Sequence, residues 1–132
     1  MPTDVALSQM TRKTTDPSST RGLVSCRRLF EGNDIELARK CAYAKTQVQS
    51  TEDREQAFYV GSDDWVKVWV NGKEVFSNLQ DRYGYPDQNR FLVKLHKGGN
   101  EILIRTGHGQ GPWRFGLRMD NDPPGAFALE TP

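Results

Sequence analysis

The sequence predicts an all-β protein that folds as an antiparallel β-sandwich, a jelly roll of about eight strands. Three observations support this prediction. Short segments alternate apolar and polar residues, turn-favouring residues separate them at regular intervals, and no segment has the apolar periodicity of a long helix. The one stretch that could form a helix, residues 33–40, is too short to carry a fold.

A hairpin in the middle of the chain gives the clearest strand signal. Residues 65–70, WVKVWV, are rich in β-branched and aromatic side chains, and their valines alternate onto one face. Asn71-Gly72 follows directly, and this dipeptide is the strongest short-range signal for a tight hairpin turn. Residues 73–77 are therefore the predicted return strand.

The other predicted strands lie on both sides of this hairpin. Upstream, residues 23–30 are predicted as a first strand, followed by strands at 37–49 and 54–62. Downstream, residues 91–96 lead into a turn at 97–100, after which the chain alternates again through Ile102 and Ile104. A last strand spans residues 113–119, and the side chains predicted to share its core face are Trp113, Phe115, Leu117 and Met119.

The length of 132 residues suits one domain with one core. We expect residues 1–22, which are rich in Thr, Ser, Asp and Pro, to be a flexible N-terminal arm. Residues 23–119 are the predicted sandwich domain, and residues 120–132 are a C-terminal tail that begins near paired prolines. Phe127 and Leu129 in this tail are expected to pack back against the domain.

The charge balance argues against two classes of partner. Eighteen Lys and Arg residues against 17 Asp and Glu leave a formal net charge of +1, so the chain lacks the basic surplus that nucleic acids and anionic membranes attract. No apolar run approaches the roughly 20 residues of a membrane helix. Residues 1–20 also lack the apolar stretch of a secretory signal. The protein is therefore either cytosolic or a module of a longer exported chain.

The two cysteines, Cys26 and Cys41, fit no zinc or redox motif. The favoured interpretation is that they are small buried apolar residues. The alternative is a disulfide between neighbouring strands, which would imply an oxidising compartment.

Alternating strand direction predicts that three loops meet at one end of the sandwich, because consecutive antiparallel strands place their turns at alternate ends. These loops are residues 62–64, 78–90 and 107–113. They carry carboxylates, amides and aromatic rings, the groups that bond sugar hydroxyls and stack on the C–H faces of sugars. The candidate ligand-binding residues are Asp63, Asp64, Trp65, Arg82, Tyr83, Tyr85, Gln88, His108 and Gln110.

Two segments resemble a known group of folds. Residues 61–75, GSDDWVKVWVNGKEV, and residues 95–104, LHKGGNEILI, resemble galactose-binding-domain-like β-sandwiches. The nearest comparisons are the sugar-binding modules attached to glycoside hydrolases and the protective-antigen-type lectin domain of toxins and adhesins. The resemblance covers residues 58–119 and implies a non-catalytic carbohydrate-binding domain within a larger, extracellular or periplasmic protein.

The resemblance also implies a metal. In the adhesin branch, two consecutive aspartates hold a calcium ion that contacts the sugar, and Asp63 and Asp64 match those positions. Calcium takes about six to eight oxygen ligands. Asp81 and Asp87 are therefore further candidate ligands, together with Asn78 and loop carbonyls.

Less specific interpretations stay open for the same residues. Asp63 and Asp64 can instead cap a turn by bonding nearby backbone N–H groups. The predicted function is a carbohydrate-binding accessory module, and the alternative is a structural or protein-interaction sandwich with no sugar ligand. An enzyme is not expected, because no Ser/His/Asp or Cys/His arrangement stands out in the sequence.

Overall fold

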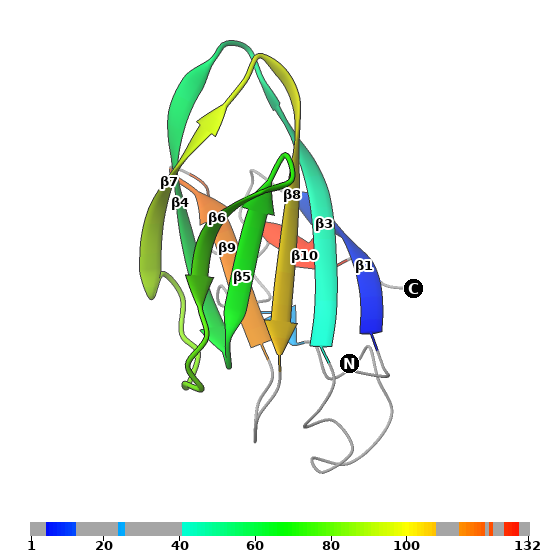
Figure 1. Cartoon of the computed structure of the whole chain (residues 1–132), viewed down its shortest axis with the longest axis vertical. Helices are drawn as coiled ribbons and strands as arrows, with labels where there is room; N and C mark the ends of the chain where they lie inside the picture. The colour runs from blue at the N-terminus through cyan, green and yellow to red at the C-terminus, as the bar shows by residue number, and fades with distance from the viewer. Residues whose placement is uncertain are drawn as a thin grey trace.

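The computed structural model describes residues 5–12, 24–25, 41–107, 114–120, 122 and 126–129. They form a β-sandwich in which two sheets pack face to face (Figure 1). The strands are β1 (Val5–Arg12), β2 (Val24–Ser25), β3 (Cys41–Ser50), β4 (Arg54–Asp63), β5 (Val66–Val70), β6 (Lys73–Asn78), β7 (Asn89–Leu95), β8 (Gly98–Gly107), β9 (Arg114–Met119) and β10 (Phe127–Leu129).

The larger sheet has the order β10-β1-β3-β8-β5-β6, and the smaller sheet has the order β2-β9-β4-β7. All pairs are antiparallel except that of β1 with β3, which is parallel. The seven strands from β3 to β9 form the antiparallel body of the sandwich. The all-β sandwich predicted from the sequence is confirmed.

Period-two alternation explains the core. The three valines of β5 are 0–4% exposed and face the smaller sheet, as the sequence predicts. From the other side, Phe115, Leu117 and Met119 of β9 fill the same core. Phe91 stacks between Phe58 of its own sheet and Phe76 of the opposite sheet, with ring centroids 5.8 and 5.1 Å away. These rings close the sandwich at its β6/β7 side.

The Asn71-Gly72 hairpin forms as predicted between β5 and β6. Both turn residues have a positive φ, 52° for Asn71 and 80° for Gly72, as the tightest hairpin turns require. The pairing of the two strands slips by one residue between Val68 and Trp69, which makes a β-bulge.

The N-terminal region differs from the sequence-based expectation. Residues 5–12, placed within a flexible arm, form β1 along the edge of β3. The sequence gives little sign of this strand, because its pairing partner lies far along the chain. The other residues of the proposed arm, the possible helix at 33–40 and Cys26 lie outside the described residues. Cys41 is buried and has a free thiol.

The C-terminal segment returns to the body. Phe127 is fully buried, as expected, and β10 pairs antiparallel with β1. Among the described residues, no helix has the length and apolarity needed to cross a bilayer.

Candidate functional site

The candidate site lies at the end of the sandwich where β4 ends and β5 begins. Residues 78–90, called the tyrosine loop here, join β6 to β7 at this end (Figure 1). The backbone N–H of Asp64 donates to the carbonyl of Gly107 over 3.0 Å, which brings the end of β8 to the same place. The first two predicted rim loops therefore meet, and the third begins beside them. His108, Gln110 and Trp113 lie outside the described residues.

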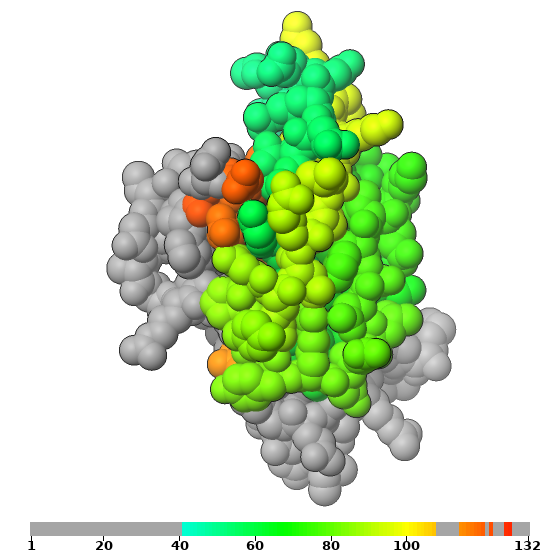
Figure 2. All heavy atoms as spheres, turned by 90° about the vertical axis from the view of Figure 1, so that its left-hand side faces the viewer, coloured from blue at the N-terminus to red at the C-terminus, as the bar shows by residue number. Residues whose placement is uncertain are grey.

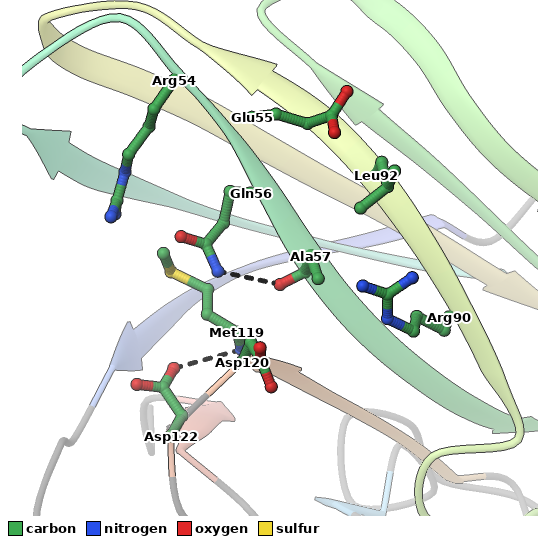
Figure 3. Close-up of a pocket in the computed structure, with 9 residues that line it drawn as sticks. All are labelled: Arg54, Glu55, Gln56, Ala57, Arg90, Leu92, Met119, Asp120 and Asp122. Atoms are coloured by element: carbon green, nitrogen blue, oxygen red, sulfur yellow. Dashed lines mark hydrogen bonds between the residues drawn. The ribbon is translucent and has the colours of Figure 1, made fainter.

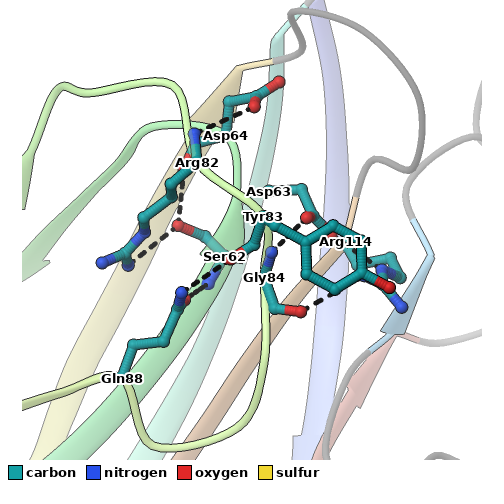
Figure 4. Close-up of polar contacts among 8 residues, drawn as sticks. All are labelled: Ser62, Asp63, Asp64, Arg82, Tyr83, Gly84, Gln88 and Arg114. Atoms are coloured by element: carbon teal, nitrogen blue, oxygen red, sulfur yellow. Dashed lines mark hydrogen bonds and ion pairs between the residues drawn. The ribbon is translucent and has the colours of Figure 1, made fainter.

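The tyrosine loop is anchored by contacts that it makes with residues 62–64 (Figure 4). The N–H of Ser62 donates to Gln88 Oε1 over 2.8 Å, and Gln88 Nε2 donates to the carbonyl of Tyr83 over 2.8 Å. The N–H of Arg82 donates to Asp64 Oδ1 over 3.2 Å, and the N–H of Gly84 donates to Asp63 Oδ1. Both aspartates thus bond backbone N–H groups, which is the role that the turn-capping interpretation gives them. The peptide bond that joins these two aspartates is cis.

Asp63 carries the main charge interaction of the site. It is only 2% exposed, and its Oδ2 accepts from Arg114 Nε over 2.7 Å. Arg114 Nη2 also donates to the carbonyl of Gly84 over 3.2 Å, so one guanidinium ties β9 to the loop. The hydrogen bond to Asp63 raises the pKa of Arg114 above its usual value. Breaking such a pair leaves a buried charge without its partner, which typically costs about 3–5 kcal/mol.

Two glycines let the loop lie this close to the strands. A Cβ on Gly61 would stand 1.9 Å from the carbonyl oxygen of Tyr85, and one on Gly84 would stand 2.7 Å from the nitrogen of Asp63. Gly61 pairs with Gly116 of β9, and both alternate with core residues. The loop therefore crosses the outer face of the smaller sheet, directly above a pair of residues without side chains.

Arg82 braces the loop from within. Its Nη1 donates to Asn89 Oδ1 over 2.6 Å, and its Nη2 donates to Ser62 Oγ over 3.1 Å. Burial lowers the pKa of Arg82 below its usual value. Both terminal nitrogens of the Arg82 guanidinium, Nη1 and Nη2, therefore have hydrogen-bond partners, one in the loop and one in β4.

The loop presents two tyrosine rings to solvent. Tyr83 is 68% exposed and Tyr85 is 59% exposed, although the backbone between them is buried against β4. The guanidinium of Arg114 lies 5.0 Å from the centroid of the Tyr83 ring. The loop and β7 form much of the surface on this side of the molecule (Figure 2). The arrangement is a rigidly attached loop with exposed aromatic side chains.

Trp65 lies elsewhere than the two tyrosines. It precedes the buried Val66, so alternation points its ring to the outer face of the larger sheet. A Cβ on Gly107 would stand 2.0 Å from this ring, and the guanidinium of Arg105 lies 5.2 Å from its centroid. The ring is partly exposed. The candidate residues from the sequence thus divide between two surfaces.

The described carboxylates do not fit the calcium site that the resemblance implies. Asp87 accepts from Arg118 Nε and Nη2 over 2.9 and 3.0 Å, and this hydrogen bonding raises the pKa of Arg118. Asp63 is bound by Arg114, while Asp81 is exposed. Within the ranges that the structure describes, no group of three or more His, Cys, Asp or Glu side chains could hold a metal ion.

A pocket of about 610 Å³ opens on the smaller sheet, and of the tyrosine loop only its last residue, Arg90, lines it (Figure 3). Gln56 Nε2 bonds the carbonyl of Ala57, and Asp122 Oδ2 accepts from the N–H of Met119 over 3.1 Å, so two of its polar groups support the local backbone. The side chains that line the pocket include both acidic and basic groups, and this mixture indicates no particular class of ligand. The lining residues are Arg54, Glu55, Gln56, Ala57, Arg90, Leu92, Met119, Asp120 and Asp122.

Sequence reasoning missed three residues that shape the site: Arg114, Gly61 and Gly84. The role of Arg114 could have been predicted from the sequence, because this residue begins a strand at the predicted end of the sandwich, near two aspartates that a sandwich would partly bury. The roles of the two glycines could not have been predicted, since a close approach of two backbones depends on the path of the loop.

No protein-family model matches this chain, and no curated protein matches its sequence.

Proposed function

We propose that the protein is a non-catalytic carbohydrate-binding module that recognises a poly- or oligosaccharide through the tyrosine loop. The observation that carries the proposal is the pair of exposed rings, Tyr83 and Tyr85, on a loop held by buried polar contacts. Sugars present C–H faces that stack on aromatic rings. In a longer protein, such a module would hold a catalytic or adhesive partner domain near its polysaccharide.

The anchoring of the loop favours binding. A loop that must become ordered on binding loses part of the interaction energy to conformational entropy. The backbone of the tyrosine loop is already fixed by Ser62, Asp63 and Asp64, so this loss is small. These three residues act as positioning residues, together with Arg82 and Gln88.

Exposed polar side chains on the same loop can bond hydroxyl groups. Gln80 and Asp81 are both exposed and lie two or three positions before Tyr83. A carboxylate accepts hydrogen bonds, while an amide both donates and accepts, so together they match the hydroxyls at the edge of a sugar ring.

The ion pairs that two carboxylates of the site form with arginines favour a non-catalytic role. Glycoside hydrolysis needs one carboxylic acid to protonate the leaving oxygen and a second carboxylate across the scissile bond. Asp63 and Asp87 are each held by an arginine, and this pairing suits neither role.

A protein-interaction domain is the second candidate function. The observation that favours it is Leu79, which is 61% exposed on the same loop and adds apolar surface that a sugar does not require. A protein partner would use Leu79 together with the tyrosines.

Affinity electrophoresis in gels that contain soluble polysaccharides tests the proposal, preceded by a glycan array to choose the polymers. We expect Tyr83→Ala and Tyr85→Ala each to weaken binding about two- to twelvefold, since one ring contact contributes about 0.5–1.5 kcal/mol. Leu92→Ala is the matched control, because Leu92 is 49% exposed on β7 and lies off the loop.

The two candidate functions give different results. Unchanged sugar binding in both tyrosine variants, or no retardation of the wild type by any polymer, contradicts the carbohydrate proposal. Leu79→Ala should leave sugar binding intact if the loop binds sugar.

A further inference from the structure

The outer face of the larger sheet carries aromatic and basic side chains that have no part in the site at the tyrosine loop. In the register of the sheet, Tyr43 of β3 lies beside Arg105 of β8, which lies beside Lys67 of β5. The next row brings together Lys45, Leu103 and Trp69. All six side chains are partly exposed, and β3, β8 and β5 run side by side in Figure 1. These residues and Trp65 are called the basic aromatic face.

Arg105 is held at the centre of this face between two rings. Its guanidinium carbon lies 5.4 Å from the centroid of the Tyr43 ring and 5.2 Å from that of the Trp65 ring. Trp65 in turn packs against Gly107, where any side chain would collide with the indole ring. The guanidinium is therefore fixed in position before any ligand arrives.

Arg105 differs from the other arginines that stack on tyrosine rings. Arg114 and Arg118 stack on Tyr83 and Tyr59, and each is neutralised by a carboxylate, Asp63 and Asp87 respectively. Among the described residues, no ion pair joins Arg105 to a carboxylate, and its buried Nε has no hydrogen-bond partner. A fixed guanidinium without a counter-charge is a binding group for a planar anion such as a carboxylate.

The neighbouring lysine adds to this charge. Lys67 forms an ion pair with Glu74, but the distance is 3.6 Å and the two side chains are 31% and 49% exposed. Exposed pairs of this kind contribute little. Lys67 can therefore turn toward an anion bound at Arg105 at small cost.

We propose that the basic aromatic face binds an acidic polysaccharide, with a uronate carboxylate on the guanidinium of Arg105 and an adjacent sugar ring on Trp69. The inference rests on the proposed function for its class of ligand, a polysaccharide, but it concerns a different surface. A nucleic acid is the less favoured anion, because the net charge of +1 lacks the surplus needed along a phosphate backbone.

The test uses affinity electrophoresis of the full chain in gels that contain polygalacturonate, fully methyl-esterified polygalacturonate or poly(U). We expect retardation by polygalacturonate that Arg105→Gln weakens about tenfold and Lys67→Gln about threefold. Lys94→Gln is the matched control, since Lys94 is an exposed lysine on β7 of the other sheet. The esterified polymer has the same backbone without the charge, so Arg105→Gln should leave its binding unchanged.

Three outcomes would overturn the inference. They are equal losses in Arg105→Gln and Lys94→Gln, stronger retardation by poly(U) than by polygalacturonate, and unchanged binding in Arg105→Gln. Should Arg105→Gln fail to fold, Lys67→Gln decides by the same comparison with Lys94→Gln. Tyr83→Ala separates the two proposals, because it is expected to weaken binding of the esterified polymer, which Arg105→Gln does not.

Discussion

Two glycines and one buried aspartate decide where the tyrosine loop sits. Gly61 leaves room for the backbone of Tyr85, and Gly84 leaves room for that of Asp63. Asp63 then holds the loop by bonding the N–H of Gly84 and the guanidinium of Arg114. The exposed rings are thus positioned by neighbours that need not touch a ligand themselves.

Gly61→Ala tests this dependence. The added methyl group would stand 1.9 Å from the carbonyl oxygen of Tyr85, and the obstacle is backbone, which cannot rotate away. We expect a loss of about 3 kcal/mol in the free energy of unfolding, measured in urea, and a parallel loss of sugar binding.

Gly99→Ala is the control for this change. A Cβ there meets only the ends of the Gln47 and Gln49 side chains, at 3.0 and 3.2 Å, and flexible side chains can move aside. If both variants unfold at the same urea concentration, the close approach of loop and strand does not restrain the loop.

For single residues, the sequence predicts which side chains lie at this end of the sandwich, but not which hydrogen-bond and ion-pair partners they have there. The alternating direction of consecutive strands was enough to predict that Asp63, Asp64 and the tyrosines lie at the same end of the sandwich. The partner of Asp63, Arg114, stands 51 positions away, and the choice between it and other cations depends on side-chain placement in the folded state. Alternation with Val66 already places Trp65 on the outer face of its own strand, but strand direction alone could not show that the loop with Tyr83 covers the other sheet.

Among the elements, the β5–β6 hairpin and the turn before β8 are joined by one buried asparagine. Asn100 is 0% exposed, and its Oδ1 accepts from the N–H of His96 and from Asn71 Nδ2 over 3.1 and 3.0 Å. Its Nδ2 group lies within 3.0–3.3 Å of the carbonyls of Val48, His96 and Gly98. This side chain therefore holds β3, β8 and the hairpin turn together.

Asn100→Ala should cost about 3 kcal/mol of folding stability, because it removes the hydrogen bonds that join three segments and deprives the buried carbonyl of Val48 of this partner. Thermal and urea unfolding followed by circular dichroism would measure the loss. Asn78→Ala is the comparison, since the Asn78 side chain bonds only an exposed N–H, that of Gln80. Equal stability of the two variants would show that water replaces Asn100.

The strands themselves were largely predictable. Alternation assigned β4 to β7 and β9 within one or two residues, because a half-buried strand shows its period directly in the sequence. The start of β8 was placed too late, because Gly98, Gly99 and Asn100 were assigned to a turn but are the first residues of this strand. Strand β1 was missed because it pairs parallel with β3, and some thirty residues of chain lie between the two strands. The local alternation of apolar and polar residues does not indicate a pairing partner so far away in the sequence.

For the molecule as a whole, the two proposed surfaces lie on different sheets. The tyrosine loop crosses the outer face of the smaller sheet, while the basic aromatic face belongs to the larger one. Since the core separates them, a substitution on one should leave the other unaffected.

Calcium should not change the stability of the whole fold. The carboxylates of Asp63 and Asp87 are already held by arginines, so a cation would have to displace two ion pairs before binding there. We expect the same melting temperature in excess calcium and in chelator, measured by differential scanning fluorimetry. A rise of several degrees with calcium would show that the native state binds the ion.

The β-bulge between β5 and β6 has a consequence for the behaviour of the protein at high concentration. β6 is the outermost strand of its sheet, and an unbroken strand there would offer a template for a second molecule to extend the sheet. The slipped register bends this border, and Lys73 and Glu74 place opposite charges along it. Both features disfavour strand addition between molecules, so this border resists the edge-to-edge aggregation that threatens open sandwiches.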